Sequence, residues 1–211
     1  MDSYAQHGED LILWRFFGGR REGMFVDVGA HDGITFSNTY LLEQQGWRGV
    51  CIEPNPDVYP TCWVNRRKSV CIMSAVGERE GIATLHRDVS GLFASLVSAL
   101  PVLEVDRISV RTHTLDGLLD GLEWVVPKID FISIDVEGME LAVLRGFDVA
   151  RWQPRVLIIE ANTDDARAEL VHYMGTLGYA FARAYNQNCI FVKPDDLVRW
   201  GWADDDYTAA D

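Results

Sequence analysis

Acidic side chains end four of the five apolar runs that punctuate the sequence. They are Asp27, Glu53, Asp135 with Glu137, and Glu160. A carboxylate can hold a cation, accept hydrogen bonds from sugar hydroxyls, or take a proton from a reacting hydroxyl. Any one of these acids could instead cap a helix or lie in solvent. Like charges repel, however, and shifted carboxylates gather at functional sites, so the set together favours a binding or catalytic site.

The elements that must position these acids alternate between strand and helix. Apolar runs predict strands at residues 24–28, 49–53, 69–76, 130–135 and 155–160. Helices are expected at 37–46, from Pro56 onward, at 114–122, at 139–147 and at 163–178. Alternating patterns predict half-exposed strands at 81–87 and 107–113, and a closing hairpin at 179–193 around Asn186–Asn188.

This order of elements predicts an α/β fold with a mostly parallel sheet. Nearly continuous apolar strands separated by helices indicate a sheet that is covered on both faces, and the terminal hairpin adds antiparallel strands at one edge. Ligands of such sheets bind beyond the carboxyl ends of the strands. The four acidic strand ends, together with Ser74–Val76, should therefore meet at one edge of the sheet.

The residue types in the turn after the first strand indicate which class of ligand is bound. Residues 29–33 read Gly-Ala-His-Asp-Gly, and a dinucleotide fingerprint would need a glycine where His31 stands. Asp32 adds negative charge where a diphosphate would lie. Both features disfavour a nicotinamide oxidoreductase. S-adenosylmethionine carries a sulfonium and an ammonium and no phosphate, so it fits. Glu53 follows Gly29 by 24 residues, near the spacing at which an acid binds ribose hydroxyls.

Length and charge narrow the class of protein. The chain has 211 residues and a formal charge of −13, which suits a single domain and disfavours nucleic acid or an anionic membrane as partner. We predict one domain over 1–195 and an acidic tail over 196–211, frayed or lid-like. No apolar run reaches a membrane span and no secretory signal is evident, so a cytoplasmic location is expected. The basic cluster Arg66–Lys68 is interpreted as a solvated helix end.

The four cysteines, Cys51, Cys62, Cys71 and Cys189, contain no C-x-x-C pair, so a zinc site is poorly supported. Three of them lie in apolar, strand-like runs. We expect buried, reduced thiols.

Several blocks of the sequence together resemble the FkbM-type methyltransferases. They are SYAQHGED at 3–10, FVDVGAHDG at 25–33, SNTYLLEQQGWRGVCIEPNP at 37–56, TLD at 114–116, DFISIDVEGMELAVLRGFD at 130–148 and PRVLIIE at 154–160. The resemblance implies a class I, Rossmann-like methyltransferase fold with a seven-stranded sheet and one antiparallel strand near an edge. It also implies S-adenosyl-L-methionine as methyl donor and usually O-methylation of a hydroxyl, often on a sugar or natural product.

The same resemblance implies roles for individual residues. Asp27, Gly29, His31, Asp32 and Gly33 would line the methionine end of the cofactor, with Ala30, Ser37 and Asn38 also in the binding region. Glu53 would bind the ribose hydroxyls, with Pro54 and Asn55 beside the adenine and Ser74, Ala75 and Val76 flanking it. Gln6 and Tyr4 would cover the donor from the N-terminus. Asp135 and Glu137 would face the transferring methyl group.

Methyl transfer to a hydroxyl benefits from a nearby base. Glu137 is the first candidate and Asp135 the second, whereas Glu140 is expected only to complement the dipole of the helix that it starts. The end-of-strand oxygens of Asp135, Glu160 and Asn162 form a possible half-shell for Mg²⁺. His7 and His113 could each act as a base near neutral pH, but a structural or surface role is expected for both. Ser95 is a candidate to line the pocket.

The acceptor is not encoded in any readable motif. We expect a small molecule or a glycan, recognised by the insertion at about 78–112 and by the tail, where Trp200, Trp202 and Tyr207 could form a lid or simply dock on the domain. The alternatives are an N- or carboxyl-methyltransferase on the same fold, or a binding module that keeps the fold without catalysis. Oligomeric state cannot be predicted from these residues.

Overall fold

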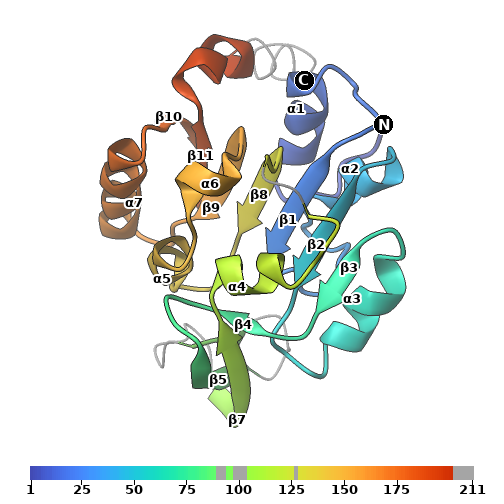
Figure 1. The fold of residues 1–211 in the computed structure, drawn as a ribbon, viewed down its shortest axis with the longest axis vertical. Coiled ribbons are helices and arrows are strands. Elements are labelled where there is room, and N and C mark those ends of the chain that lie inside the picture. The colour runs from blue at the N-terminus through green and yellow to red at the C-terminus, as the bar shows by residue number, and fades with distance from the viewer. Residues whose placement is uncertain (89–93, 97–103, 126–127, 202–211) are drawn as a thin grey trace.

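The computed structural model describes residues 1–88, 94–96, 104–125 and 128–201 (Figure 1). Its main sheet has seven strands: β1 (Met24–Val28), β2 (Arg48–Ile52), β3 (Val70–Ile72), β8 (Phe131–Ile134), β9 (Val156–Glu160), β10 (Ala180–Tyr185) and β11 (Asn188–Val192). Their order is β10-β11-β9-β8-β1-β2-β3. Five adjacent strands, β9, β8, β1, β2 and β3, are mutually parallel. Strand β11 runs antiparallel to both of its neighbours, β9 and β10. The predicted Rossmann-like sheet is confirmed.

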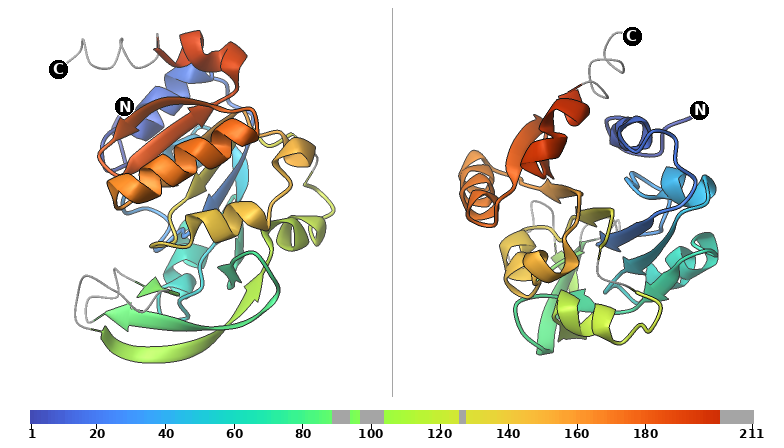
Figure 2. Two further views of the ribbon diagram at one scale, coloured as in Figure 1. Left: turned by 90° about the vertical axis from the view of Figure 1, so that its left-hand side faces the viewer. Right: turned by 45° about the horizontal axis from the view of Figure 1, so that its top comes forward.

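Helices cover both faces of this sheet (Figure 2). They are α1 (Glu9–Phe16), α2 (Tyr40–Gln44), α3 (Tyr59–Asn65), α4 (Leu115–Asp120), α5 (Glu140–Arg145), α6 (Val149–Trp152) and α7 (Asp164–Thr176). Helices α1 to α3 contribute to one buried cluster with Phe25, Phe131 and Ile158, whereas α4 to α7 contribute to the other, with Val26, Ile132 and Leu157. Because successive strand residues point to opposite faces, each apolar strand supplies both clusters.

A second sheet lies beyond the carboxyl ends of the parallel strands (Figure 1). It is formed by β4 (Ala75–Val76), β5 (Gly81–Asp88), β6 (Ala94–Ser95) and β7 (Glu104–His113), in the order β4-β7-β5-β6. The prediction of one strand over 69–76 is therefore wrong: the chain leaves the main sheet after Ile72, and Ala75 pairs instead with Thr112. The apolar pattern continues through both strands, so it does not reveal the change of sheet.

Two predicted helices are shorter than expected. The helix predicted at 37–46 is limited to α2, because the Ser37 hydroxyl accepts hydrogen bonds from the N–H groups of Thr39 and Tyr40 in the turn before it. The helix expected from Pro56 begins at Tyr59. Helix α1 was not predicted, although Ile12, Leu13 and Phe16 fall on one face and are fully buried.

The C-terminal segment continues with a 3-10 turn at Pro194–Asp196 and is helical over 197–201. Trp200 is 2% exposed and its ring lies 5.7 Å from that of Phe16. Figure 1 shows this part of the chain beside α1, at the end of the molecule opposite to the second sheet. Trp200 therefore docks on the domain, whereas Trp202, Tyr207 and the acidic residues 204–211 lie outside the described residues. Within the described residues no helix has the length and apolar character to cross a membrane.

Candidate active site

A cleft of about 710 Å³, open to solvent, lies between the carboxyl ends of the parallel strands and the second sheet. Val28, Ile52, Leu85, Leu96 and Met139 supply its apolar wall. The predicted site residues that line it are Gly29, His31, Glu53, Pro54, Asn55, Ser74, Ala75, Val76, Asp135 and Glu137. The sheet thus gathers strand ends that are more than 100 residues apart in sequence.

The turn after β1 needs a glycine at its first position. Gly29 has a φ of 87°, and a Cβ at this position would lie 1.7 Å from the carbonyl oxygen of Asp135. The N–H groups of Gly29 and Ala30 both donate to the carbonyl oxygen of Ile52, at 2.9 and 3.0 Å. The missing side chain therefore lets β1 and β8 end side by side, with the backbone turned across the end of β2.

Glu53 is buried at the end of β2 and organises the neighbouring loops. Its carboxylate accepts one backbone N–H from His31 at 2.9 Å and another from Asn55 at 2.7 Å. Burial raises the pKa of this carboxyl to about 7, although the two N–H donors act in the opposite direction. The side chain links the glycine turn to the Pro54–Asn55 loop, so both walls of the cleft depend on it.

Asp27 does not line the cleft and belongs to a buried polar network under the glycine turn. Its carboxylate accepts a 2.5 Å hydrogen bond from the Thr39 hydroxyl and lies 3.7 Å from the Arg66 guanidinium. Burial raises the pKa of Asp27, while Arg66 opposes the rise.

Arg66 is fully buried and also donates to the Glu43 carboxylate at 2.9 Å and to the carbonyl oxygen of Gly33 at 2.9 Å. The interpretation of Arg66 as part of a solvated helix end is wrong. Arg67 and Lys68 are exposed as expected.

Several other predicted cofactor residues lie around this network rather than in the wall of the cleft. Asp32 accepts hydrogen bonds from Thr35 and the Ile34 N–H, and these bonds lower its pKa although partial burial opposes them. Ser37 is buried against Arg66. The Asn38 amide donates to Ser133 at 3.1 Å, and its buried oxygen has no partner among the described residues.

The N-terminal segment is fixed close to the same loops. Asp10 accepts hydrogen bonds from the Ser3 hydroxyl and from the N–H groups of Tyr4 and Ala5. The Tyr4 ring contacts the Tyr40 ring edge-on, with centroids 4.7 Å apart, and Gln6 is exposed. Neither Tyr4 nor Gln6 lines the cleft in this structure.

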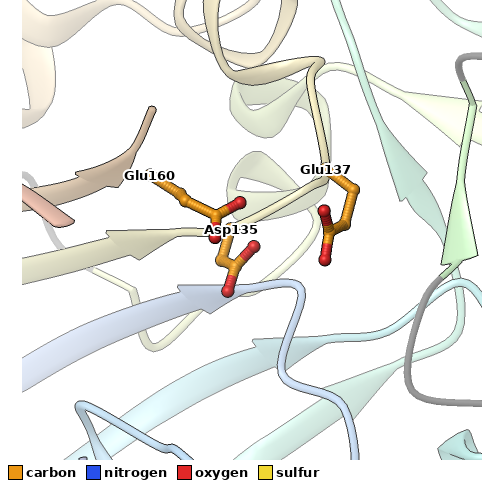
Figure 3. Close-up of side chains that lie close together, drawn as sticks. All are labelled: Asp135, Glu137 and Glu160. Atoms are coloured by element: carbon orange, nitrogen blue, oxygen red, sulfur yellow. The ribbon is translucent and has the colours of Figure 1, made fainter. Parts of the chain in front are cut away.

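Figure 3 shows three carboxylates close together, and two of them, Asp135 and Glu137, line the floor of the cleft. One oxygen atom each from Asp135, Glu137 and Glu160 lies within 4.8 Å of the other two. Removal from bulk water and the charge of Glu160 raise the pKa of Asp135 well above its usual range, although this side chain opens to the cleft. Desolvation and the charges of Glu160 and Glu140 raise the pKa of Glu137 to about 7. A carboxyl that titrates near neutral pH can exchange a proton with a substrate.

The backbone that carries Glu137 is held in an uncommon conformation. Glu137 has a φ of 55° and Gly138 a φ of 103°. The Ser95 hydroxyl donates to the Glu137 carbonyl oxygen at 2.6 Å, and the Glu140 carboxylate accepts the N–H of Gly138 at 2.9 Å. A left-handed conformation in a residue with a side chain is costly and persists where surrounding contacts impose it, often at active sites. Glu140 thus shapes the loop in addition to starting α5.

Asn162 approaches the carboxylates with its amide nitrogen. Its Nδ2 donates to Glu160 at 2.9 Å and lies 3.5 Å from a Glu137 oxygen. In this orientation Asn162 presents a donor to the cluster. The oxygen ligands predicted from Asp135, Glu160 and Asn162 are therefore replaced by those of Asp135, Glu137 and Glu160.

The two histidines considered as bases have other contacts. The His113 Nδ1 lies 2.8 Å from the Ser74 hydroxyl, and the His7 Nε2 lies 3.0 Å from the Asn186 amide. His113 thereby links the end of β7 to a residue of the cleft wall.

The model of the FkbM methyltransferase domain family matches residues 27–181. The chain belongs to this family. It is an S-adenosylmethionine-dependent methyltransferase, and the family resemblance inferred from the sequence is confirmed. The chain has no match among curated proteins.

Solved structures show the same fold at low sequence identity. A precorrin-6y C5,15-methyltransferase from Geobacter metallireducens has a TM-score of 0.53 and 14% identity, with 90% of each chain covered. TrmK of M. capricolum, in complex with S-adenosylhomocysteine, has a TM-score of 0.51 and 11% identity over 91% of this chain and 70% of that one. A methyltransferase from Geobacter sulfurreducens has a TM-score of 0.51 and 11% identity, with 92% of this chain and 79% of that one covered.

Proposed function

We propose that the protein transfers the methyl group of S-adenosylmethionine to a hydroxyl of a small molecule or a sugar. The observation that carries the proposal is the Glu137 carboxylate, which lies in the cleft beside Asp135 with a pKa of about 7. A family member must bind the methyl donor, and the acidic floor of the cleft supplies a base for a hydroxyl acceptor. We also propose that the protein acts in the cytoplasm.

The residues of the cleft suit this donor. Among the described residues that line it there is no lysine or arginine, so nothing in the wall repels a sulfonium or an ammonium. We propose that Glu53 accepts hydrogen bonds from the ribose hydroxyls, and that Pro54, Asn55, Ser74, Ala75 and Val76, which also line the cleft, contact the adenine. TrmK, which shares the fold, is in complex with S-adenosylhomocysteine, and this supports a cofactor in the corresponding cleft.

The remaining predicted cofactor residues act through the loops that they support. The Gly29–Gly33 turn, resting on Asp27 and Arg66, would hold the methionine end, and Asn38, which donates to Ser133, would support it from below. Ala30, Asp32 and Ser37 shape this turn. Tyr4 and Gln6 would cover the cofactor from the N-terminal segment that Asp10 fixes.

The chemistry asked of the chain is modest. S-adenosylmethionine supplies an activated methyl group, and the protein aligns the acceptor oxygen behind it. The acceptor hydroxyl must lose its proton, and Glu137 is proposed to take it. Desolvation and the negative charges of Glu160 and Glu140 keep the Glu137 carboxylate basic enough for this task. The strained loop fixes the Glu137 side chain over the cleft, so little reorganisation is needed.

The carboxylate floor also bears on the two alternative acceptors. A carboxylate acceptor would be repelled by Asp135, Glu137 and Glu160, so carboxyl methylation is disfavoured. An amine acceptor would be attracted as a cation, which makes N-methylation the second candidate.

Transfer of a labelled methyl group to a panel of acceptors tests the proposal. The panel contains sugars and phenols, primary amines, and carboxylic acids of similar size. We expect label in the hydroxyl acceptors, in products that survive mild base. Methyl esters would lose their label in base and amines would carry it on nitrogen by mass fragmentation. Label found only in these two classes would contradict the proposal.

We also propose that Mg²⁺ binds at the three carboxylates and supports activity. The oxygens of Asp135, Glu137 and Glu160 lie within 4.8 Å of one another, so small side-chain movements would bring them together around a hard divalent cation. Activity should fall at least about tenfold in a chelator and return with Mg²⁺, because the ion would offset the mutual repulsion of the carboxylates. Full activity after exhaustive chelation would refute magnesium dependence. The repulsion among the three carboxylates would then be relieved by protons that they share.

A further inference from the structure

Three of the four cysteines lie together under the cofactor loop, outside the cleft. Cys51 on β2 and Cys71 on β3 are paired in register across the parallel ladder. Cys62 on α3 packs over them, and its sulfur lies 4.0 Å from that of Cys71. Cys51 and Cys62 are fully buried, whereas Cys71 is half-buried on β3, the edge strand of the main sheet. A small oxidant can therefore reach Cys71 first.

We propose that Cys62 and Cys71 form a reversible disulfide in response to peroxide, and that this bond weakens cofactor binding. In the first step the Cys71 thiolate attacks peroxide, which gives a sulfenic acid and, with one proton, a water molecule. In the second step the Cys62 thiol displaces the hydroxyl of the sulfenic acid, and a second water leaves as the sulfur–sulfur bond forms. Two thiols lose two electrons in total, and the peroxide is reduced to water.

The surroundings favour Cys71 as the sulfur that reacts first. Hydrogen bonds from the thiols of Cys51 and Cys62 lower the pKa of Cys71, and the nearby Arg66 guanidinium acts in the same direction. Burial raises the pKa of Cys51, which leaves that thiol protonated. The thiolate is the nucleophile, so oxidation should begin at Cys71.

The bond would act on the cofactor loop through α3. The Cys62 sulfur lies 3.3 Å from the position that a Cβ would take on Gly33. Arg66, one turn later, donates to the Gly33 carbonyl oxygen at 2.9 Å and to the Ser37 and Thr39 hydroxyls. A disulfide needs its sulfurs at about 2.05 Å, so closing the bond draws Cys62 toward β3 by about 2 Å. The loop that rests on Cys62 and Arg66 must shift with it.

Peroxide titration of the full chain, followed by mapping of disulfides in a non-reducing digest, tests the bond. The denatured protein should lose two of its four titratable thiols, and dithiothreitol should restore them. The Cys189→Ser variant is the matched control and should form the same bond. In Cys62→Ser, Cys71 should instead oxidise further to a product that dithiothreitol does not reverse. Absence of a bond between Cys62 and Cys71, or a bond of either to Cys51, would overturn the proposal.

S-adenosylhomocysteine binding to the same samples tests the consequence. The affinity of the wild type and of Cys189→Ser should fall at least about tenfold on oxidation, which corresponds to about 1.4 kcal/mol, and recover on reduction. Cys71→Ser should keep its affinity in peroxide. Unchanged affinity of the bridged wild type would overturn the coupling. The reduced wild type separates this result from the proposed function: failure of the reduced protein to bind would count against the cofactor site, while the disulfide map stands independently.

Discussion

Replacing Glu137 with glutamine should lower the rate of methyl transfer by about 100-fold or more, the usual contribution of a general base. The amide keeps the shape of the side chain but cannot accept the proton of the acceptor hydroxyl. Affinity for S-adenosylhomocysteine should change little, because the side chain acts on the acceptor. Single-turnover rates with labelled donor measure the effect. Glu123→Gln, which alters an exposed acid outside the cleft, is the matched control.

The pH dependence makes this test sharper. With a pKa of about 7 for Glu137, the wild-type rate should rise through neutral pH as the carboxyl loses its proton. In Glu137→Gln this rise should disappear. A variant that keeps both the rate, within a factor of three, and the rise would show that another group is the base.

Although Glu137→Gln should lower activity, it should raise the free energy of unfolding at high pH. The pKa of Glu137 rises from 4.5 to about 7 on folding, so the folded state binds the proton more tightly. The free energy of unfolding therefore falls as pH increases from about 4.5 to 7, and the full cost is present above pH 7. Removing the charge should stabilise the protein without cofactor by about 1–2 kcal/mol at pH 8, after allowance for solvent screening, and have little effect at pH 4. Lower stability of the variant at pH 8 would contradict this account.

Replacing Arg66 with methionine should lower the free energy of unfolding by about 3–5 kcal/mol. The side chain is fully buried, and its loss would leave the carboxylates of Asp27 and Glu43 without their cation. Arg66→Lys should be intermediate, because an ammonium keeps the charge but cannot reproduce the fork of hydrogen bonds to Glu43 and Gly33. Unfolding in urea at fixed pH gives the values.

The adjacent residue provides the control for this series. Arg67 is exposed, so Arg67→Met should change stability by less than about 0.5 kcal/mol. Equal effects of the two methionine substitutions would show that the buried network contributes no more than an exposed arginine. Should Arg66→Met not fold, the lysine variant still discriminates between the two positions.

The parts of the fold that could be predicted are those with an unambiguous apolar pattern. The strands of the parallel sheet are buried on both faces, so their sequences are continuous apolar runs, and the acids that end them had to converge at one edge. The break between β3 and β4 could not be predicted, since Ile72 and Ala75 are equally apolar and only their hydrogen-bond partners differ.

Charged residues were harder to place. Three consecutive basic residues at 66–68 look alike in sequence, yet only Arg66 is fully buried. A signal was present: Asp27 and Glu43 both lie in apolar surroundings and require a cation. The orientation of the Asn162 amide depends on the side-chain contacts at Glu160 and left no trace in the sequence.

Thermal unfolding with added ligands tests the central claim that the cleft binds the methyl donor. S-adenosylmethionine and S-adenosylhomocysteine, each at about 100 times its dissociation constant, should stabilise the fold by about 2.7 kcal/mol and raise the melting temperature by roughly 5–10 °C. NAD at the same concentration should have no effect, because His31 and Asp32 replace the glycine and the neutral surface that a diphosphate needs. No shift with either adenosyl compound, or an equal shift with NAD, would contradict the account.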